Sequence, residues 1–518
     1  MLSTQARGIA AGEALGAVRG DRGAWWLPGL TEVVFISVLL WLLVGGAQGR
    51  ALLADGDTGW HIRTGDYILD QRRFPTTDLF SFSRPGTEWF AWEWASDVLL
   101  AMAHRAAGLE GVVLLSGILI AGTSAALFRY LIWLRVNVLV AVVAMLVAGS
   151  ASSVHWLARP HLFTYLLLGL CLWWLEADRR RPSRWIWGLV PVAAAWTNLH
   201  GGFLLLPATL GFYLVGSVIE QWPSGRRDWR APRRYLWLAL AAGAATLANP
   251  YGYRLHGHIW KYLRSDFIRN RVEEFQSPRF RGESMLLFEL LLLAGLVAVP
   301  RLWRRGEYAW ALLVVAFAHA ALGSVRHVLL YVVAATPAVA RELSEWLERL
   351  GGGWGSAFAA EAGVNRWRPP LWALGAVALT AFLLHSGAAR WKVDFPKEKF
   401  PQRALEAAEK KLLGRRVFTS DEWGDYLIYR YYPRIRVFID GRSDFYGPAI
   451  GEQYLSALQA HHRWEGILDD HGFEVALLPA EWPLASVLKA HPGWRLEYDD
   501  GQALLLRRVE RQAVLSAK

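Results

Sequence analysis

Long apolar runs, separated by short arginine-rich segments, fill the first three quarters of the 518-residue chain. Each run approaches the ~20 residues that a helix needs to cross a hydrocarbon core of ~30 Å. The pattern therefore predicts a polytopic α-helical membrane protein with about eleven spanning helices. We expect these helices at residues 28–48, 111–134, 137–157, 160–176, 185–198, 203–220, 235–249, 285–300, 308–323, 327–340 and 371–387.

The pattern changes after residue 387, where short apolar segments alternate with helix-like ones. The segments rich in Val, Leu, Ile, Phe and Tyr predict strands, and those with a helical period ending at glycines predict helices. Strands are expected at 416–420, 436–440, 475–479, 494–498 and 503–508, and helices at 402–413, 451–470 and 483–490. Such alternation is typical of an α/β domain. We therefore divide the chain into a transmembrane domain, residues 28–387, and a C-terminal α/β domain, residues 388–518.

The charge pattern gives an expected topology. The chain carries a formal net charge of +11, but the segment after residue 390 is almost neutral and the excess lies in alternate short loops. Basic residues in alternate loops indicate the cytoplasmic side of a membrane protein and not a nucleic-acid surface. We expect a multi-pass protein of the bacterial inner (plasma) membrane. Its N-terminus (1–27) is then cytoplasmic, and its two long loops (49–110 and 249–284) and the C-terminal domain are extracytoplasmic.

Two carboxylates follow the first expected helix, in the string Asp55-Gly56-Asp57-Thr58-Gly59. A carboxylate close to the bilayer surface can act as a general base toward an acceptor, or can bind a divalent cation such as Mg²⁺ or Mn²⁺. The two glycines permit a tight turn and close approach by a substrate. The alternative is structural, since Asp57 can equally cap a helix that begins at Thr58.

The rest of the first outer loop carries a resemblance to a known superfamily. Asp-x-Asp-x-x-Trp-His at the start of the loop is followed by Pro-x-x-Asp, by an aromatic segment and by an amphipathic stretch at 95–107. With the many helices, this resembles the GT-C superfamily of integral-membrane glycosyltransferases, in particular the aminoarabinose-transferase and protein O-mannosyltransferase branches. The residues resemble more closely still a group of bacterial membrane proteins without a settled activity. The loop residues of interest for substrate or acceptor are Trp60, His61, Asp78, Glu93 and Trp94.

The resemblance implies a sugar donor on a polyprenyl-phosphate carrier and an acidic base in the first outer loop. By position that role falls on Asp55 or Asp57, and Gly56 separates the two acids where the mannosyltransferase branch has an adjacent pair. The expected partners are a polyprenyl-phosphate-linked sugar, a glycan, lipid or protein acceptor, and membrane lipids. No nucleic-acid partner is expected.

Further polar residues gather at the expected outer ends of the helices. Arginine is a natural partner for a lipid-linked phosphate, and ionisable groups at membrane depth are candidates for function. Each single arginine can also simply reach the lipid headgroups. The candidates for holding the donor phosphate are Arg159, His161, His200, Arg326 and His327, and Asn249 and Tyr251 open the second loop.

One motif of the C-terminal domain stands out, Asp440-Gly441-Arg442-Ser443-Asp444 at the end of an expected strand. Sites of α/β domains lie at such positions. A mutual salt bridge among Asp440, Arg442 and Asp444 that shapes the loop is the alternative. The domain would bind acceptor or glycan, or close over the membrane site.

The sequence therefore predicts an inverting membrane glycosyltransferase that acts at the outer face. Two other classes stay open. A lipid or glycan transporter or assembly scaffold would share the helices and basic residues without depending on Asp55 and Asp57. A ligase of the O-antigen type would depend on His and Arg of a late outer loop.

Overall fold

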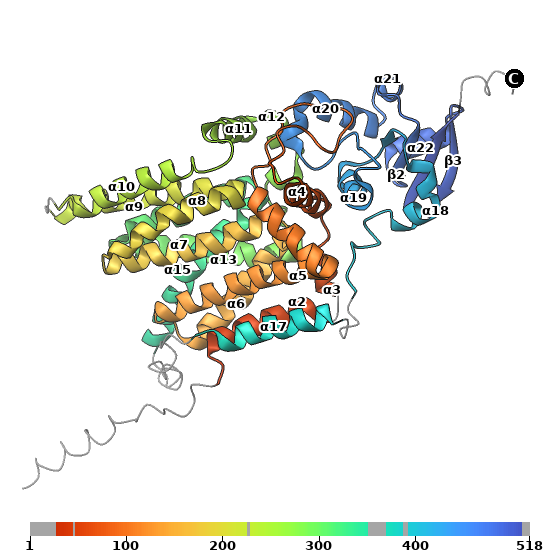
Figure 1. Ribbon diagram of the computed structural model, residues 1–518. Coiled ribbons are helices and arrows are strands. Elements are labelled where there is room, and N and C mark those ends of the chain that lie inside the picture. The colour runs from red at the N-terminus through yellow and green to blue at the C-terminus, as the bar shows by residue number, and fades with distance from the viewer. Residues whose placement is uncertain (1–26, 45–46, 225–227, 351–368, 387–391, 510–518) are drawn as a thin grey trace, which may run out of the picture.

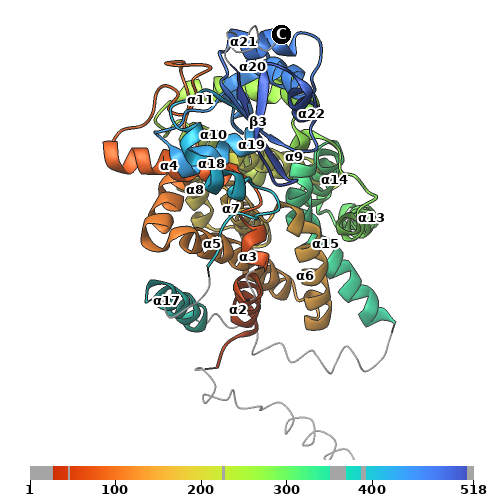
Figure 2. The same cartoon turned by 90° about the vertical axis from the view of Figure 1, so that its right-hand side faces the viewer.

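The computed structural model describes residues 27–44, 47–224, 228–350, 369–386 and 392–509. A helical membrane part, residues 27–386, stands beside a smaller α/β part, residues 392–509, which we call the tail (Figures 1 and 2). The expected cytoplasmic segment 1–27 lies, except for Leu27, outside the described residues.

Every range expected to span the membrane is largely helical. The membrane part contains α2 (Leu30–Leu43), α5 (Trp94–Trp133), α6 (Val138–Ser152), α7 (His161–Arg180), α8 (Leu189–Leu199), α9 (Leu205–Ser224), α10 (Arg230–Ala245), α13 (Glu283–Arg304), α14 (Tyr308–Gly323), α15 (Val328–Arg349) and α17 (Leu371–His385). The two long loops, which we call the first and second outer loops after their expected side, add α3 (Ala47–Ala51), α4 (Asp57–Gln71), α11 (Tyr253–Arg264) and α12 (Asp266–Arg271).

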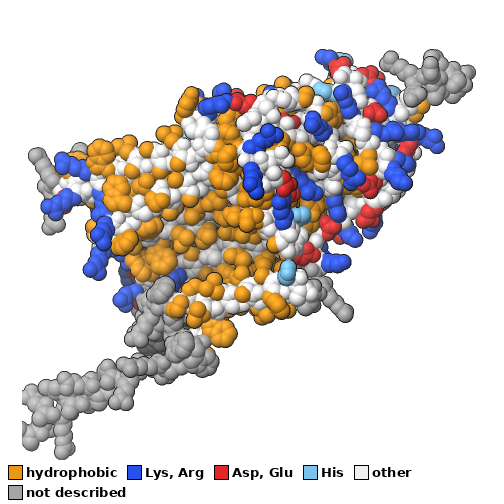
Figure 3. All heavy atoms as spheres, in the orientation of Figure 1, with side chains coloured by type: hydrophobic (Ala, Val, Ile, Leu, Met, Phe, Trp, Pro, Cys, Tyr) orange, Lys and Arg blue, Asp and Glu red, His pale blue; other side chains and the backbone are white. Residues whose placement is uncertain are grey.

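Within the described residues, four helical segments are long and apolar enough to cross a membrane, namely Trp94–Trp133, Val138–His155, Gly201–Gln221 and Met285–Arg304. Shorter apolar helices lie at Leu30–Leu43, Tyr308–Gly323 and Leu371–His385. The number of eleven spans stays a prediction. The view in Figure 3 shows a broad apolar surface over these helices, Lys and Arg side chains at the end of the bundle far from the tail, and mixed charges over the tail. This distribution fits a helical body in lipid with a water-exposed tail.

A kink divides α5 into two helical segments. Ala107 and Gly108 have non-helical backbone angles, and Gly108 has a φ of 62°. An L side chain rarely adopts this conformation, so glycine permits the break. The amphipathic stretch expected at 95–107 and the span expected at 111–134 are therefore two helices joined at Gly108.

The tail contains a small mixed sheet with the strand order β1-β2-β4-β3. Its strands are β1 (Val417–Phe418), β2 (Val475–Pro479), β3 (Trp494–Asp499) and β4 (Ala503–Arg508). β1 pairs with β2 in parallel, and the other two pairs are antiparallel. The helices are α18 (Gln402–Leu412), α19 (Asp421–Tyr431), α20 (Ser443–Leu458), α21 (Trp464–Asp470) and α22 (Pro483–Ala490).

Two expectations for the tail were wrong. Residues 436–440 do not join the sheet, because the backbone of Val437 exchanges hydrogen bonds with the first outer loop instead, accepting from Phe82 N at 2.9 Å and donating to Phe80 O at 3.0 Å. The sequence reasoning also missed α19, although Ser420 caps it by accepting a hydrogen bond from the backbone N–H of Trp423 at 3.2 Å. The expected helix 451–470 is divided into α20 and α21.

The tail packs directly on the acidic segment of the first outer loop, through contacts between α19 and α4. A Cβ atom at Gly56 would lie 2.5 Å from the backbone oxygen of Glu422, and one at Gly59 would lie 2.7 Å from that of Asp425. These glycines therefore admit α19 and not, as expected, a substrate. Arg63 secures the contact by donating from Nε to the backbone oxygen of Tyr429 at 2.9 Å.

A buried arginine joins the same two parts a second time. Arg442 Nη2 lies 2.8 Å from Asp78 Oδ1 in the first outer loop and 2.6 Å from Asp440 Oδ2, with all three side chains at most 1% exposed. Tyr446 donates a further hydrogen bond to Asp440 Oδ2 at 2.7 Å. The guanidinium also lies over the rings of Phe80 and Trp89. We call this group the Arg442 clamp.

Removing Arg442 leaves two buried carboxylates without their cation, and breaking such a pair costs about 3–5 kcal/mol. Arg442→Ala is therefore expected to lower the unfolding temperature and to expose the tail to limited proteolysis. Arg434→Ala is the control, because its ion pair with Glu409 is solvent-exposed and such pairs contribute at most about 1 kcal/mol. Equal effects of the two substitutions on unfolding would contradict the clamp.

Candidate active site

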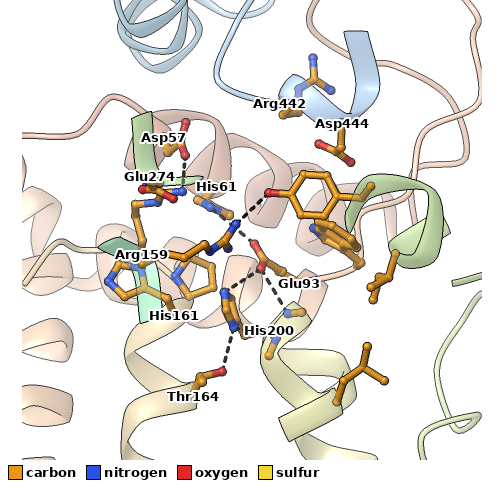
Figure 4. A pocket seen from close by; sticks show the side chains of 18 of the residues that line it. Asp57, His61, Glu93, Arg159, His161, Thr164, His200, Glu274, Arg442 and Asp444 are labelled. Carbon is orange, nitrogen blue, oxygen red and sulfur yellow. Dashed lines mark hydrogen bonds and ion pairs between the residues drawn. The ribbon is translucent and has the colours of Figure 1, made fainter. Parts of the chain in front are cut away.

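A cavity of about 340 Å³ lies where the ends of several bundle helices meet the two long loops and the tail. Figure 4 shows acidic, basic and imidazole side chains from these segments pointing into it. The cavity brings together, from the candidates expected by sequence, Asp57, Trp60, His61, Glu93, Arg159, His161, His200, Arg326, His327, Arg442 and Asp444.

Arg159 lies at the centre of three carboxylates. Its Nη1 is 2.8 Å from Asp55 Oδ2 and 2.5 Å from Glu274 Oε1, and its Nη2 is 2.7 Å from Asp57 Oδ2. Asp55 and Asp57 come from the first outer loop and Glu274 from the second. Burial raises the pKa of Glu274, but the Arg159 charge outweighs it and holds that pKa well below its usual value. We call these four residues the Arg159 cluster.

Backbone contacts fix Arg159 to the acidic segment on both sides. Ala158 donates its backbone N–H to Leu52 O at 2.7 Å, and Thr58 donates its hydroxyl to Ala158 O at 3.1 Å. Pro160 follows directly and restricts the backbone further. The guanidinium is therefore held in place by the segment whose carboxylates it pairs with.

Of the two acids Asp55 and Asp57, only Asp57 lines the cavity. It is the first residue of α4, with Gly56 at the N-cap position, so it is not the cap of a helix beginning at Thr58. Asp55 instead accepts a hydrogen bond from Asp57 N at 2.9 Å. Trp60 Nε1 donates to Asp57 Oδ1 at 3.2 Å. Burial raises the pKa of Asp57 against the lowering effect of Arg159, and Asp55 raises it further.

The tail closes the space beside Asp57. A Cβ atom at Gly441 would lie 1.9 Å from Asp57 Oδ1 and 3.0 Å from Asp425 Oδ2. Asp425 belongs to α19, and its Oδ1 accepts a hydrogen bond from Gly441 N at 2.9 Å. Burial, and then the charge of Asp57, raise the pKa of Asp425 well above its usual value. The absence of a side chain at 441 is therefore what allows the two carboxylates to lie beside the same loop.

A chain of imidazoles and carboxylates forms another wall. His61 Nδ1 lies 2.6 Å from Asp97 Oδ1, and burial lowers the pKa of His61, which favours the neutral ring. His200 Nδ1 accepts from Gly202 N at 3.0 Å and lies 2.8 Å from the Thr164 hydroxyl, which leaves its proton on Nε2.

Glu93 lies between these two histidines. Its Oε1 is 3.4 Å from His200 Nε2, and its Oε2 is 3.8 Å from His61 Nε2. Burial raises the pKa of Glu93 to about 7. Glu93 can therefore exchange a proton near neutral pH, whereas the histidines beside it stay neutral.

Arg326 differs from Arg159 in its partners. Its Nη1 donates to the hydroxyl of Tyr262 at 3.0 Å, and its guanidinium lies 4.5 Å from the centre of the Phe275 ring. Among the described residues, no carboxylate lies within ion-pair distance of it. This cavity cation therefore keeps most of its capacity for an anionic ligand.

His161 and His327 each bond to a backbone carbonyl. His161 Nε2 lies 2.8 Å from His155 O, and His327 Nδ1 lies 3.2 Å from Ala320 O. The other ring nitrogen of each is without a hydrogen-bond partner among the described residues. Both histidines can thus present one nitrogen to a ligand of the cavity.

Several expected residues do not line the cavity but support its walls. Asp78 and Asp440 belong to the Arg442 clamp. Trp94 Nε1 donates to Asn198 Oδ1 at 2.6 Å, and Asn249 Oδ1 accepts from Tyr251 N at 2.8 Å. The Tyr251 hydroxyl accepts from Ala91 N at 2.9 Å.

Asp444 pairs with His258 Nε2 at 2.9 Å and not with Arg442, so the expected three-residue salt bridge is only half present.

Sequence reasoning missed the cavity residues Glu274, Asp97, Thr164 and Tyr262. Glu274 stands in a polar loop beside Glu273, and no spacing distinguishes it from a solvated charge. Asp97 had a weak signal, because it is an acid on the apolar face of an amphipathic helix. Asp425 was detectable only together with the missed helix α19.

The residues at Asp55 and Asp57 do not fit a divalent cation in this arrangement, because the guanidinium of Arg159 already occupies the position among the carboxylate oxygens. Over the described ranges, no group of three or more His, Cys, Asp or Glu side chains is placed to hold a metal ion.

Solved structures that share this fold, a helical body with long loops and a C-terminal domain, include two of archaeal oligosaccharyltransferases. The first is the archaeal oligosaccharyltransferase AglB from Archaeoglobus fulgidus in complex with an inhibitory peptide and a dolichol-phosphate, with a TM-score of 0.57, 10% identity, and coverage of 93% of this chain and 74% of that one. The second is the Archaeoglobus fulgidus oligosaccharyltransferase in the apo form, with a TM-score of 0.54, 11% identity, and coverage of 95% and 75%.

Sequence comparison adds no relative, since no protein-family profile and no curated protein sequence matches the chain. At these identities the structural likeness establishes the fold and leaves the reaction to the residues of the site.

Gly441→Ala is expected to disturb the contact between the tail and Asp57, because its methyl group would meet Asp57 Oδ1 at 1.9 Å. Overpacking of this kind costs about 1–3 kcal/mol, so the unfolding temperature should fall. Gly466→Ala is the matched control, since a Cβ atom there has no neighbour within 4 Å. A Gly441→Ala protein as stable as Gly466→Ala would show that the tail does not close against Asp57.

Proposed function

We propose that this protein is a membrane glycosyltransferase that moves a sugar from a polyprenyl-phosphate carrier to an acceptor at the outer face of the membrane. The observation that carries the proposal is one cavity that holds the Asp57 carboxylate, several histidines and the Arg326 guanidinium, which has no carboxylate partner among the described residues, on a GT-C-like fold. Dolichol-phosphate, which accompanies the AglB structure, is itself a polyprenyl phosphate.

The donor end of the cavity has the chemistry of a lipid-linked phosphate. Arg326 supplies the positive charge, and His161, His200 and His327 line the same cavity. Next to them lies an apolar wall of Leu204, Leu205, Ala208, Ile259 and Leu263. Leu204, which lies within the candidate span Gly201–Gln221, and Leu263 are exposed at the surface. The polyprenyl chain would leave the cavity there, into the lipid.

The acceptor end contains the base. Asp57 takes the proton of the acceptor hydroxyl, the acceptor oxygen forms a bond with the anomeric carbon, and the bond between that carbon and the phosphate oxygen breaks. The electron pair leaves with the polyprenyl phosphate, whose charge Arg326 balances. One displacement inverts the anomeric carbon without a covalent enzyme intermediate. The tail residues Gly441, Arg442 and Asp444 lie on the acceptor side and would contact the acceptor.

Substitution of Asp55 and of Asp57 distinguishes an acid that acts as the base from one that has only a structural role. Both lose one contact with Arg159, but only Asp57 lines the cavity. Asp57→Asn is expected to lower kcat/KM by about 10²–10⁴-fold, the contribution of a general base, and Asp55→Asn to lower it less. Purified protein with a panel of polyprenyl-phosphate sugars provides the assay, with transfer or donor hydrolysis as the readout.

Asp57 must be deprotonated to act as the base, and burial raises its pKa. We therefore expect kcat/KM to fall as the pH drops through the pKa of Asp57, which lies well above that of an ordinary aspartate. Asp57→Asn should lack this limb. Turnover at the wild-type level in Asp57→Asn would contradict the assignment. If the protein binds donors but transfers none of the sugars, a transporter or assembly protein is favoured. If only the Arg326 and His327 variants lose turnover, a ligase of the O-antigen type is favoured.

Arg326 is expected to act on donor binding more than on the acceptor. Arg326→Ala should raise the KM or Kd for the donor by about tenfold or more, because a charge-assisted contact to phosphate is lost, whereas Arg326→Lys should retain part of the affinity. Donor titration by intrinsic fluorescence provides the measurement. An Arg326→Ala protein with unchanged donor affinity would place the phosphate elsewhere.

A further inference from the structure

The Arg159 cluster has a guanidinium at the centre of three carboxylates. Three carboxylates converge from two outer loops, and carboxylate oxygens are the ligands that Mg²⁺ and Mn²⁺ prefer. In the described chain the oxygens of Asp55, Asp57 and Glu274 lie 2.5–2.8 Å from the two terminal nitrogens of Arg159. The cation that balances these acids is therefore a side chain.

The placement of Arg159 is part of the framework and not an incidental surface contact. Its side chain is 19% exposed, and its backbone neighbours bond to Leu52 and Thr58 on either side of the acids. Burial lowers the pKa of Arg159, but the carboxylates outweigh it and keep the guanidinium charged. The planar guanidinium presents two fixed nitrogens, so it holds three carboxylates in one geometry, which a lysine ammonium cannot do as well.

We propose that Arg159 is a built-in cation that takes the place of a divalent metal ion, so that this protein holds its first-loop acids without a metal. A second cation among the same oxygens would lie next to the guanidinium and be repelled by it. Removal of the guanidinium leaves three carboxylates with no counter-charge. The Arg159→Ala protein is then expected to acquire a site for Mn²⁺ or Mg²⁺ that the wild type lacks.

One consequence rests on the proposed function. Arg159 Nη2 holds Asp57 Oδ2, and Asp57 Oδ1 lies beside Trp60 and Gly441, two residues that line the cavity. Arg159 is thus a positioning residue for the base. Loss of such positioning costs about 10²-fold in turnover, and Mn²⁺ in the vacated position should restore part of it.

The direct test measures metal binding and needs no substrate. Tag-free full-length protein in detergent is titrated with Mn²⁺, and free Mn²⁺ is followed by electron paramagnetic resonance. The wild type should bind no Mn²⁺ at the cluster, and Arg159→Ala should bind one ion per chain and gain thermal stability with it. Arg159→Lys retains a cation and should bind none.

Two controls assign the result to the cluster. Arg326→Ala removes another arginine from the cavity and should not acquire Mn²⁺, whereas Asp55→Asn combined with Arg159→Ala should lose the acquired site. Folded Arg159→Ala without Mn²⁺ binding would overturn the proposal. If Arg159→Ala does not fold with or without Mn²⁺, Mn²⁺ binding to the wild-type protein is the test. One bound Mn²⁺ per wild-type chain that is lost in Asp55→Asn overturns the proposal, and the absence of a bound Mn²⁺ supports it. Inactivity of the wild type toward every donor would count only against the proposed function.

Discussion

A guanidinium that is removed from water needs carboxylates at hydrogen-bond distance, and Arg442 finds one on each side of the boundary between the tail and the first outer loop. The guanidinium keeps both carboxylate partners only while the tail and the first outer loop stay in contact. The aromatic rings of Phe80 and Trp89 exclude water from the pair and make separation costly. Because Gly441 and Asp444 flank this arginine, the same contact fixes the part of the tail that closes the cavity.

The two cavity arginines from the membrane part illustrate how partners decide the role of a charge. Arg159 is surrounded by three carboxylates and has little capacity left for a ligand. Arg326 has a tyrosine hydroxyl and an aromatic ring, which leave its charge available. The sequence placed both at the outer ends of helices and gave both the same expected role. Only the neighbours distinguish a structural cation from a ligand-binding one.

The hydrophobic pattern was sufficient to predict the helical body and the sheet-containing tail, because apolar periodicity records what each segment buries. It could not predict partners that come from distant segments. Glu274 meets Arg159 only through folding of the second loop, and residues 436–440, apolar enough for a strand, bond to the first loop and not to the sheet. Gly56 and Gly59 were expected to admit a substrate, whereas their missing side chains make room for a helix of the tail. The capping serine of α19 was a usable signal that a helix begins at Asp421.

The position of Gly441, Arg442 and Asp444 in the chain also constrains biosynthesis. These residues complete a cavity whose other walls begin at Asp57, so the pocket unites segments separated by almost four hundred residues. A nascent chain that has inserted all its helices still carries an open, solvated cluster of acids and imidazoles. Contacts of such long range form late, after the local helices. Any chain truncated before residue 441 would therefore lack the wall of the cavity that Gly441, Arg442 and Asp444 supply, so the cavity is complete only after the tail has been synthesised.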